Sequence, residues 1–179
     1  MTDCYGAKEL AASFRTVRKN TIQIAEDLPE EKYDFVAAPE VRSVRRMLAH
    51  VAITTGISQE LHSSGITSFV GFDFLKFMDR FQTEEAKPRT KAEIVELLRT
   101  EGDKYATWLE GLTPEFLAQG ITEGDGKTSK SRFERLLGTK EHEMHHRAQL
   151  MLIERQLGIV PHLTRQFQER VAQMRTAKA

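Results

Sequence analysis

Apolar residues recur at intervals of three and four in four long stretches, and this periodicity limits the fold more than any other feature of the chain. The interval is that of one face of an α-helix. In the first stretch, over about 7–28, the face consists of Leu10, Phe14, Val17, Thr21, Ile24 and Leu28. We find no convincing alternation of polar and apolar residues of the kind that predicts β-strands. The sequence therefore predicts an all-α protein.

The other three stretches carry equally clear helix signals. The second stripe contains Val44, Met47, Val51, Ile57 and Leu61, with His50 and Thr54 set among them. The third begins with a capping box at Thr90 and Glu93 and should end near Gly111. The fourth begins with a capping box at Ser131 and Glu134, and Gly158 and Pro161 supply stop signals after Leu157. Four such helices predict a four-helix bundle.

The length of 179 residues predicts one domain over 1–179, with the bundle at 7–158. A tail helix over about 162–176 has Phe167, Val171 and Met174 on one side, and we expect it to pack against the bundle or a second subunit. The connections 29–40 and 113–130 are shorter than the one at 62–89. That longest connection is rich in phenylalanine, with Phe69, Phe72, Phe74, Phe77 and Phe81. We expect these rings to close one end of the bundle, with the lining of a substrate pocket as the alternative.

Charge and composition exclude some classes of partner. Lys+Arg and Asp+Glu both number 26, so no basic excess indicates nucleic-acid binding. No apolar run approaches the roughly 18 residues that a membrane span needs. The first residues lack the features of a secretory signal, and Cys4 is the only cysteine. We therefore expect a cytoplasmic protein without a membrane span or a disulfide, in which Cys4 has no role.

Candidate chemistry concentrates in the fourth helix, where His142, His145 and His146 follow one another closely. Positions four apart differ by about 40° around a helix, so His142 and His146 share one face and can reach one metal ion. That face also carries Leu150 and Ile153 and should point to the core. His50 lies on the apolar stripe of the second helix, within reach of the pair in a bundle. The alternative is three buried histidines that are each hydrogen-bonded to backbone or water.

The same residues match the zinc-protease pattern His-Glu-x-x-His, with Glu143 as the general base. A third ligand would then come from a downstream residue such as Glu169. The extended form of the pattern would need Gly at 149 and His at 152, where this chain has Gln149 and Leu152. The two readings differ in His50, which a protease site would not use.

Other polar residues are weaker candidates for acid, base or supporting roles. They are Glu101, which interrupts the apolar stripe of the third helix, and Glu141, Glu143, His145 and Arg147 around the histidines. Glu141, His145 and Arg147 are also typical of an ordinary helix surface, whereas Glu101 lies on a predicted inner face.

Three stretches of the sequence resemble the DinB-like (DinB/YfiT) family of metal-binding four-helix bundles. The matching stretches are 28–33 with 39–43, then Leu48-Ala49-His50-Val51-Ala52, and finally His142-Glu143-Met144-His145-His146-Arg147-Ala148-Gln149. The resemblance covers about 7–158. Family members often have Arg-Gly-Gln where this chain has Arg147-Ala148-Gln149, a departure that leaves the histidines untouched.

The resemblance implies a divalent metal, with Zn²⁺ or Ni²⁺ as the leading candidates, held by His50, His142 and His146. It also implies a small-molecule substrate, because characterised relatives include thiol transferases that use bacillithiol, mycothiol or glutathione, and a maleylpyruvate isomerase. Relatives also suggest a homodimer. We therefore expect a metal-dependent thiol S-transferase or hydrolase. The alternatives are a non-catalytic metal-binding bundle that serves as a sensor, carrier or dimerisation module and, more remotely, the protease.

Overall fold

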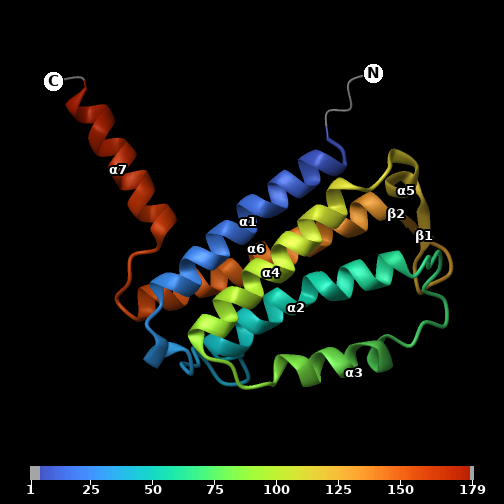
Figure 1. Cartoon of the computed structure of the whole chain (residues 1–179), viewed down its shortest axis with the longest axis horizontal. Helices are drawn as coiled ribbons and strands as arrows, with labels where there is room; N and C mark the ends of the chain where they lie inside the picture. The colour runs from blue at the N-terminus through green and yellow to red at the C-terminus, as the bar shows by residue number, and fades with distance from the viewer. Residues whose placement is uncertain (1–4, 178–179) are drawn as a thin grey trace.

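Four long helices form a bundle in the computed structural model, which describes residues 5–177, apart from the side chain of Arg80. They are α1 (Ala7–Asp27), α2 (Val44–Ser63), α4 (Lys91–Glu110) and α6 (Arg132–Gln156). Helices α1 and α2 each pack against both α4 and α6, so they lie at opposite corners of the bundle (Figure 1). The predicted all-α bundle is confirmed, as are the capping boxes that begin α4 and α6.

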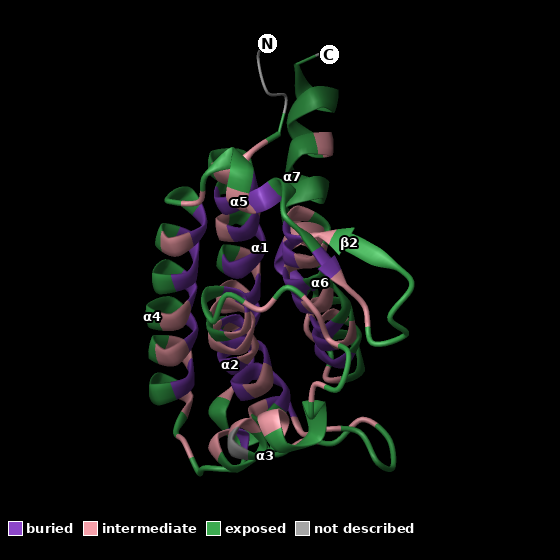
Figure 2. Ribbon diagram, turned by 90° about the vertical axis from the view of Figure 1, so that its right-hand side faces the viewer, coloured by how far each residue is buried: buried purple, intermediate pink, exposed green. Residues whose placement is uncertain are grey.

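The core divides into two apolar clusters along the bundle. One contains Ile24, Leu28, Tyr33, Leu48, Leu98 and Leu150, and the other contains Leu10, Phe14, Tyr105, Leu109 and Leu136. The residues coloured as buried lie on the inner faces of the helices (Figure 2). Near the middle of the bundle, the buried side chain of Arg18 in α1 reaches Glu143 of α6 and backbone carbonyls of α2 and α4.

The long connection contains a helix, α3 (Phe74–Glu85), which runs along α2 (Figure 1). The expected closure of a bundle end is therefore wrong for most of the rings, which form successive edge contacts beside α2 from Phe69 through Phe72 and Phe77 to Phe81. Phe81 instead lines a cavity of about 60 Å³ next to His50. The signal for α3 was present, because Asp73 caps it and its rings are spaced by three and four.

The connection after α4 contains α5 (Pro114–Ala118) and a hairpin of β1 (Gly120–Thr122) and β2 (Ser129–Ser131). The expected absence of strands is therefore wrong here. Strands of three residues are too short to show alternation, and the turn between them depends on Gly126, whose φ is +69°. The remaining short element, η1 (Glu30–Lys32), is a single 3-10 turn between α1 and α2.

The tail helix, α7 (His162–Thr176), projects away from the bundle (Figure 1). Its apolar side does not pack on the chain itself, because Phe167 and Met174 are 61% and 65% exposed. Packing against a second subunit stays a prediction. None of the helices in residues 5–177 combines the length and apolar character that crossing a bilayer requires. Cys4 lies outside the described residues.

Candidate metal centre

His50 of α2 meets His142 and His146 of α6 near the middle of the bundle, as the sequence predicted. The Nε2 atoms of His50 and His146 each lie 3.1 Å from Nε2 of His142. One ligand atom from each ring falls within 4.8 Å of both others. The three residues, called the histidine cluster below, are buried or half-buried. Adjacent packing of α2 and α6 brings the rings together, although His50 and His142 are 92 positions apart.

Hydrogen bonds at the Nδ1 atoms of His50 and His146 determine the direction of the lone pairs on their Nε2 atoms. Nδ1 of His50 lies 2.9 Å from a carboxylate oxygen of Glu85, and Nδ1 of His146 lies 2.8 Å from Oε1 of Gln149. Because both partners are acceptors, both Nδ1 atoms carry protons. A proton at Nδ1 leaves Nε2 of each ring, in its neutral form, with an unprotonated lone pair directed at His142.

With all three rings neutral, as in metal ligands, the cluster is short of donors. The Nε2 atom of His142 can donate one proton to one neighbour, so at least one lone pair faces another nitrogen without a hydrogen between them. A cation satisfies all three lone pairs together. Nitrogens bound tetrahedrally to zinc at about 2.0 Å lie about 3.3 Å from one another, close to the 3.1 Å separations here. The donor set and its spacing therefore fit a divalent metal ion.

The electrostatic surroundings keep the two rings of α6 neutral, which metal ligands require. The pKa of His142 is lowered to about 4, mainly by burial and also by the nearby rings of His146 and His50. Burial also lowers the pKa of His146, against the hydrogen bond from its ring to Gln149, which raises it. Both rings are therefore uncharged at neutral pH and available as ligands.

Glu85, the last residue of α3, was missed by the sequence analysis. Burial raises its carboxyl pKa, but hydrogen bonds from His50 and Arg42 outweigh that effect and leave the pKa at about 2. Arg46 also reaches the carboxylate, at 3.4 Å. Glu85 is therefore ionised and orients the ring of His50. Such a carboxylate behind a ligating histidine fixes the ring and increases its basicity.

Glu143, the candidate protease base, lies on a different side of α6 from the histidine cluster. Its carboxylate is buried and forms an ion pair with Arg18 of α1, with Nε of Arg18 at 2.9 Å. The remaining nitrogens of Arg18 donate to the carbonyl oxygens of Leu98 in α4 and Val51 in α2. This pair ties all four bundle helices together, and its carboxylate does not face the metal ligands. The proposed downstream ligand Glu169 is exposed on α7.

The other candidate residues lie outside the cluster. Glu101 is next to Gly56 of α2 and 3.8 Å from Lys104. His145 is exposed and contacts the amide of Gln149. Arg147 is half-buried. Burial lowers the pKa of His162 at the start of α7, and the positive charge of Arg147 lowers it as well. Glu141 is exposed beside His142.

Comparisons with known proteins agree with this architecture. Among solved structures, YfiT from Bacillus subtilis, described as a probable metal-dependent hydrolase with an unusual four-helix bundle topology, aligns with a TM-score of 0.65 at 17% identity, covering 86% of this chain and 88% of its own. A DinB-like protein from Bacillus subtilis, YjoA, aligns with a TM-score of 0.62 at 22% identity, covering 84% of this chain and 92% of its own. No curated protein sequence matches. The model of the DinB family matches residues 1–176, and the chain therefore belongs to the DinB family.

Proposed function

We propose that the chain is a metal-dependent enzyme that acts on a small molecule. It activates either a thiol for transfer to that molecule or water for its hydrolysis. The histidine cluster is the observation that carries this proposal. Three neutral ligands leave a coordination position open, which is typical of catalytic rather than structural zinc sites. Zn²⁺ and Ni²⁺ are both suited to imidazole ligands. A bound divalent ion of this kind lowers the pKa of a coordinated water and deprotonates a coordinated thiol.

The chain's own residues support this chemistry by positioning and charge. Glu85 holds the Nδ1 proton of His50, and Gln149 holds that of His146, so both rings keep their Nε2 atoms directed inward. The negative charge of Glu85 also offsets part of the positive charge of an ion in the cluster. A non-catalytic metal carrier would share these features, so turnover decides between the two.

Metal titration of purified, chelator-treated protein tests the site. We expect about one equivalent of Zn²⁺ or Ni²⁺ to bind to the wild type, and His50→Ala and His146→Ala to lose most of the affinity. His145→Ala is the matched control, because His145 is on the same turn of α6 and outside the cluster. Retention of full affinity by His50→Ala would contradict the bundle site and favour the protease pattern, which does not use that residue.

Activity is tested separately with the metal-loaded protein. A screen should follow conjugation of bacillithiol, mycothiol and glutathione with electrophiles, together with hydrolysis of small amides and esters. We expect turnover that disappears with chelator and in His146→Ala. Tight metal binding without acceleration of any of these reactions would favour the sensor, carrier or dimerisation role.

A further inference from the structure

A groove of about 400 Å³ between α2 and α6 begins at His142 and runs toward the hairpin. The hairpin lies at the end of the bundle where α2 ends and α6 begins (Figure 1). Volumes of this size accommodate small-molecule ligands. The histidine cluster is therefore connected to a concave surface that extends in one direction along α6.

The middle of the groove is apolar on one wall and open on the other. Ile57 and Leu61 of α2 form the apolar wall. Opposite them, Gly138 of α6 has open space where a side chain would be, because an added Cβ meets nothing within 4 Å. The hydroxyls of Ser58 and Thr139 bond to each other at 2.8 Å. This section therefore suits a chain of methylene-like groups.

The far end of the groove is rich in hydrogen-bond donors. Lys130 has no ion pair among the residues that the structure describes. The Nε atom of Arg135 is buried without a partner, although its Nη1 pairs with Glu123. His62 accepts a hydrogen bond at Nδ1 from Arg132, which can only donate, so the proton of the neutral ring is at Nε2.

The charge at this end is also positive in balance. Arg132 is 1% exposed and donates to Gln119 and to backbone oxygens, without a carboxylate partner in the described part of the chain. Glu134 lines the groove too, but Ser131 donates to its carboxylate as part of the capping box. Three cations, Lys130, Arg132 and Arg135, thus meet two carboxylates at this end, Glu123 and Glu134, whereas Glu141 lines the groove beside His142.

We propose that this groove is the substrate cleft, and that it binds a small, extended molecule with its reactive group at the histidine cluster and a carboxylate at Lys130, Arg135 and His62. Arg135 and His142 are seven residues apart on α6, so the two ends of the substrate are about 10 Å apart. The location of the reactive end rests on the proposed metal function, whereas the carboxylate end does not.

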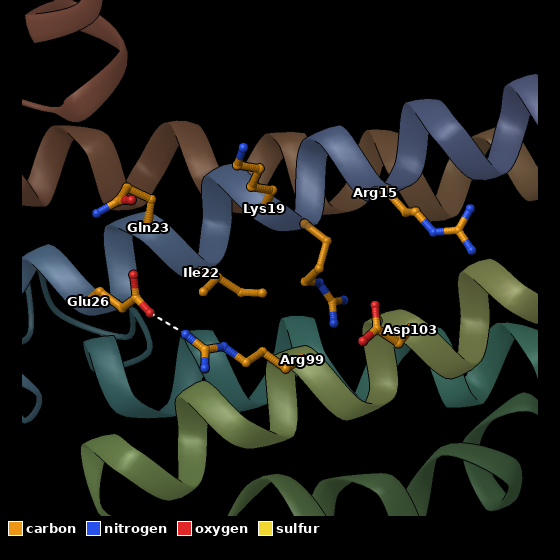
Figure 3. A pocket seen from close by; sticks show the side chains of 9 residues that line it. Arg15, Lys19, Ile22, Gln23, Glu26, Arg99 and Asp103 are labelled. Atoms are coloured by element: carbon orange, nitrogen blue, oxygen red, sulfur yellow. Dashed lines mark hydrogen bonds and ion pairs between the residues drawn. The ribbon is translucent and has the colours of Figure 1, made fainter.

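The groove between α1 and α4 does not offer the same features (Figure 3). It has a similar volume of about 430 Å³, but its residues lie on α1 and α4, and no histidine lines it. Arg99 pairs with Glu26 across it, and the guanidinium of Arg18 is bound to Glu143. Of its four cations, Arg18 and Arg99 are therefore paired with carboxylates of the chain.

Mercaptooctanoate is a suitable probe, because its sulfur and carboxylate are separated by about the required 10 Å, and mercaptooctanol is its uncharged control. Sulfur at the cluster is followed by thiolate-to-metal absorption in Co²⁺-loaded protein. Occupation of the groove is followed in metal-free protein by amide NMR shifts over 130–139. We expect the acid to bind about tenfold more tightly than the alcohol, the effect of one charge-assisted hydrogen bond.

Two variants test the two parts of the groove. Lys130→Gln should remove most of the preference for the acid, whereas Lys127→Gln, a lysine of the same hairpin outside the groove, should keep it. Gly138→Leu should fill the middle and weaken binding of both probes at least tenfold with unchanged metal affinity. Gly138→Ala, which adds only a methyl group, should weaken binding much less and shows whether the backbone tolerates a side chain there.

The outcomes separate the cleft from the metal function. Shifts over 130–139 with the acid, without Co²⁺ absorption, would support the groove and contradict the proposed metal chemistry. Co²⁺ absorption that is the same in Gly138→Leu and wild type, with no preference for the acid, would overturn the cleft and leave the metal centre in place.

Discussion

Two buried polar groups on α6, Glu143 and His146, are one turn apart and have opposite kinds of partners. The carboxylate of Glu143 faces Arg18, whose other nitrogens donate to backbone carbonyls, so this ion pair is satisfied within the chain. His146 faces the rings of His142 and His50, and three neutral rings in this arrangement have too few donors for their Nε2 lone pairs. Buried polar groups are normally satisfied, so a deficit at one of two such sites indicates which one binds something from outside.

The comparison teaches that burial of charge does not by itself identify a functional site. The Arg18–Glu143 pair is more buried than the histidine cluster, and Glu143 even belongs to a motif associated with catalysis. Its complete set of partners makes it a structural pair.

Arg18→Met should have the largest effect on stability. It leaves the carboxylate of Glu143 buried without its partner, and such changes cost about 3–5 kcal/mol. Urea denaturation measures the free energy of unfolding. Arg15→Met, which breaks the exposed pair with Glu110, is the matched control and should cost less than about 1 kcal/mol. Equal losses in the two variants would show that the buried pair is not the structural element we describe.

Metal removal should have the second largest effect on stability, and this effect should require the histidine cluster. A ligand at about a hundred times its dissociation constant stabilises the native state by about 2.7 kcal/mol. We therefore expect chelator to lower the melting temperature of metal-loaded wild type but not of His146→Ala. A metal-dependent shift that persists in His146→Ala would place the binding site elsewhere.

Glu154 offers a third buried polar group on α6, with no hydrogen-bond partner for either carboxylate oxygen. Burial raises its pKa to about 7, and the charge of Asp27 contributes. The pKa of Glu154 is therefore higher in the folded than in the unfolded state. The stability linked to protonation of Glu154 is fully present below about pH 4.5 and is lost as the pH rises through about 7.

Glu154→Gln should therefore stabilise the protein by about 2 kcal/mol at pH 8 and have little effect near pH 4.5. The measurement is urea denaturation at the two pH values. The exposed Glu169 provides the control, since Glu169→Gln should change stability by less than about 0.5 kcal/mol at either pH. A stabilisation that did not depend on pH would rule out ionisation of Glu154 as its cause.

Glu85→Gln should have the smallest effect of the four, because it keeps the shape of the side chain and removes only its charge. We expect metal affinity to fall about tenfold, or about 1.4 kcal/mol, at the lower end of the range for partners of ligating histidines. Calorimetric metal titration measures it. Glu84→Gln, at the neighbouring half-buried carboxylate that pairs with Lys87 and Arg89, should leave the affinity unchanged. An equal loss in both variants would indicate a general electrostatic effect.

The sequence by itself determined the four bundle helices and the shared face of His142 and His146, because both depend on local properties. Capping boxes, stop signals and the helical repeat act within a few residues, and they correctly located the ends of α4 and α6. The apolar stripe of α2 also indicated that His50 points inward. A second local pattern, the spacing of the rings in α3, was present but attributed to a loop.

Only the tertiary structure decided which polar groups satisfy one another. Glu85 reaches His50 from a separate helix, and Arg18 reaches Glu143 across 125 positions of sequence. No local pattern encodes these pairings, because they follow from which helices are neighbours and how far each is rotated about its axis. The same rotation turned Glu143 away from the histidines although it lies beside one of them in the chain, since consecutive residues of a helix point about 100° apart.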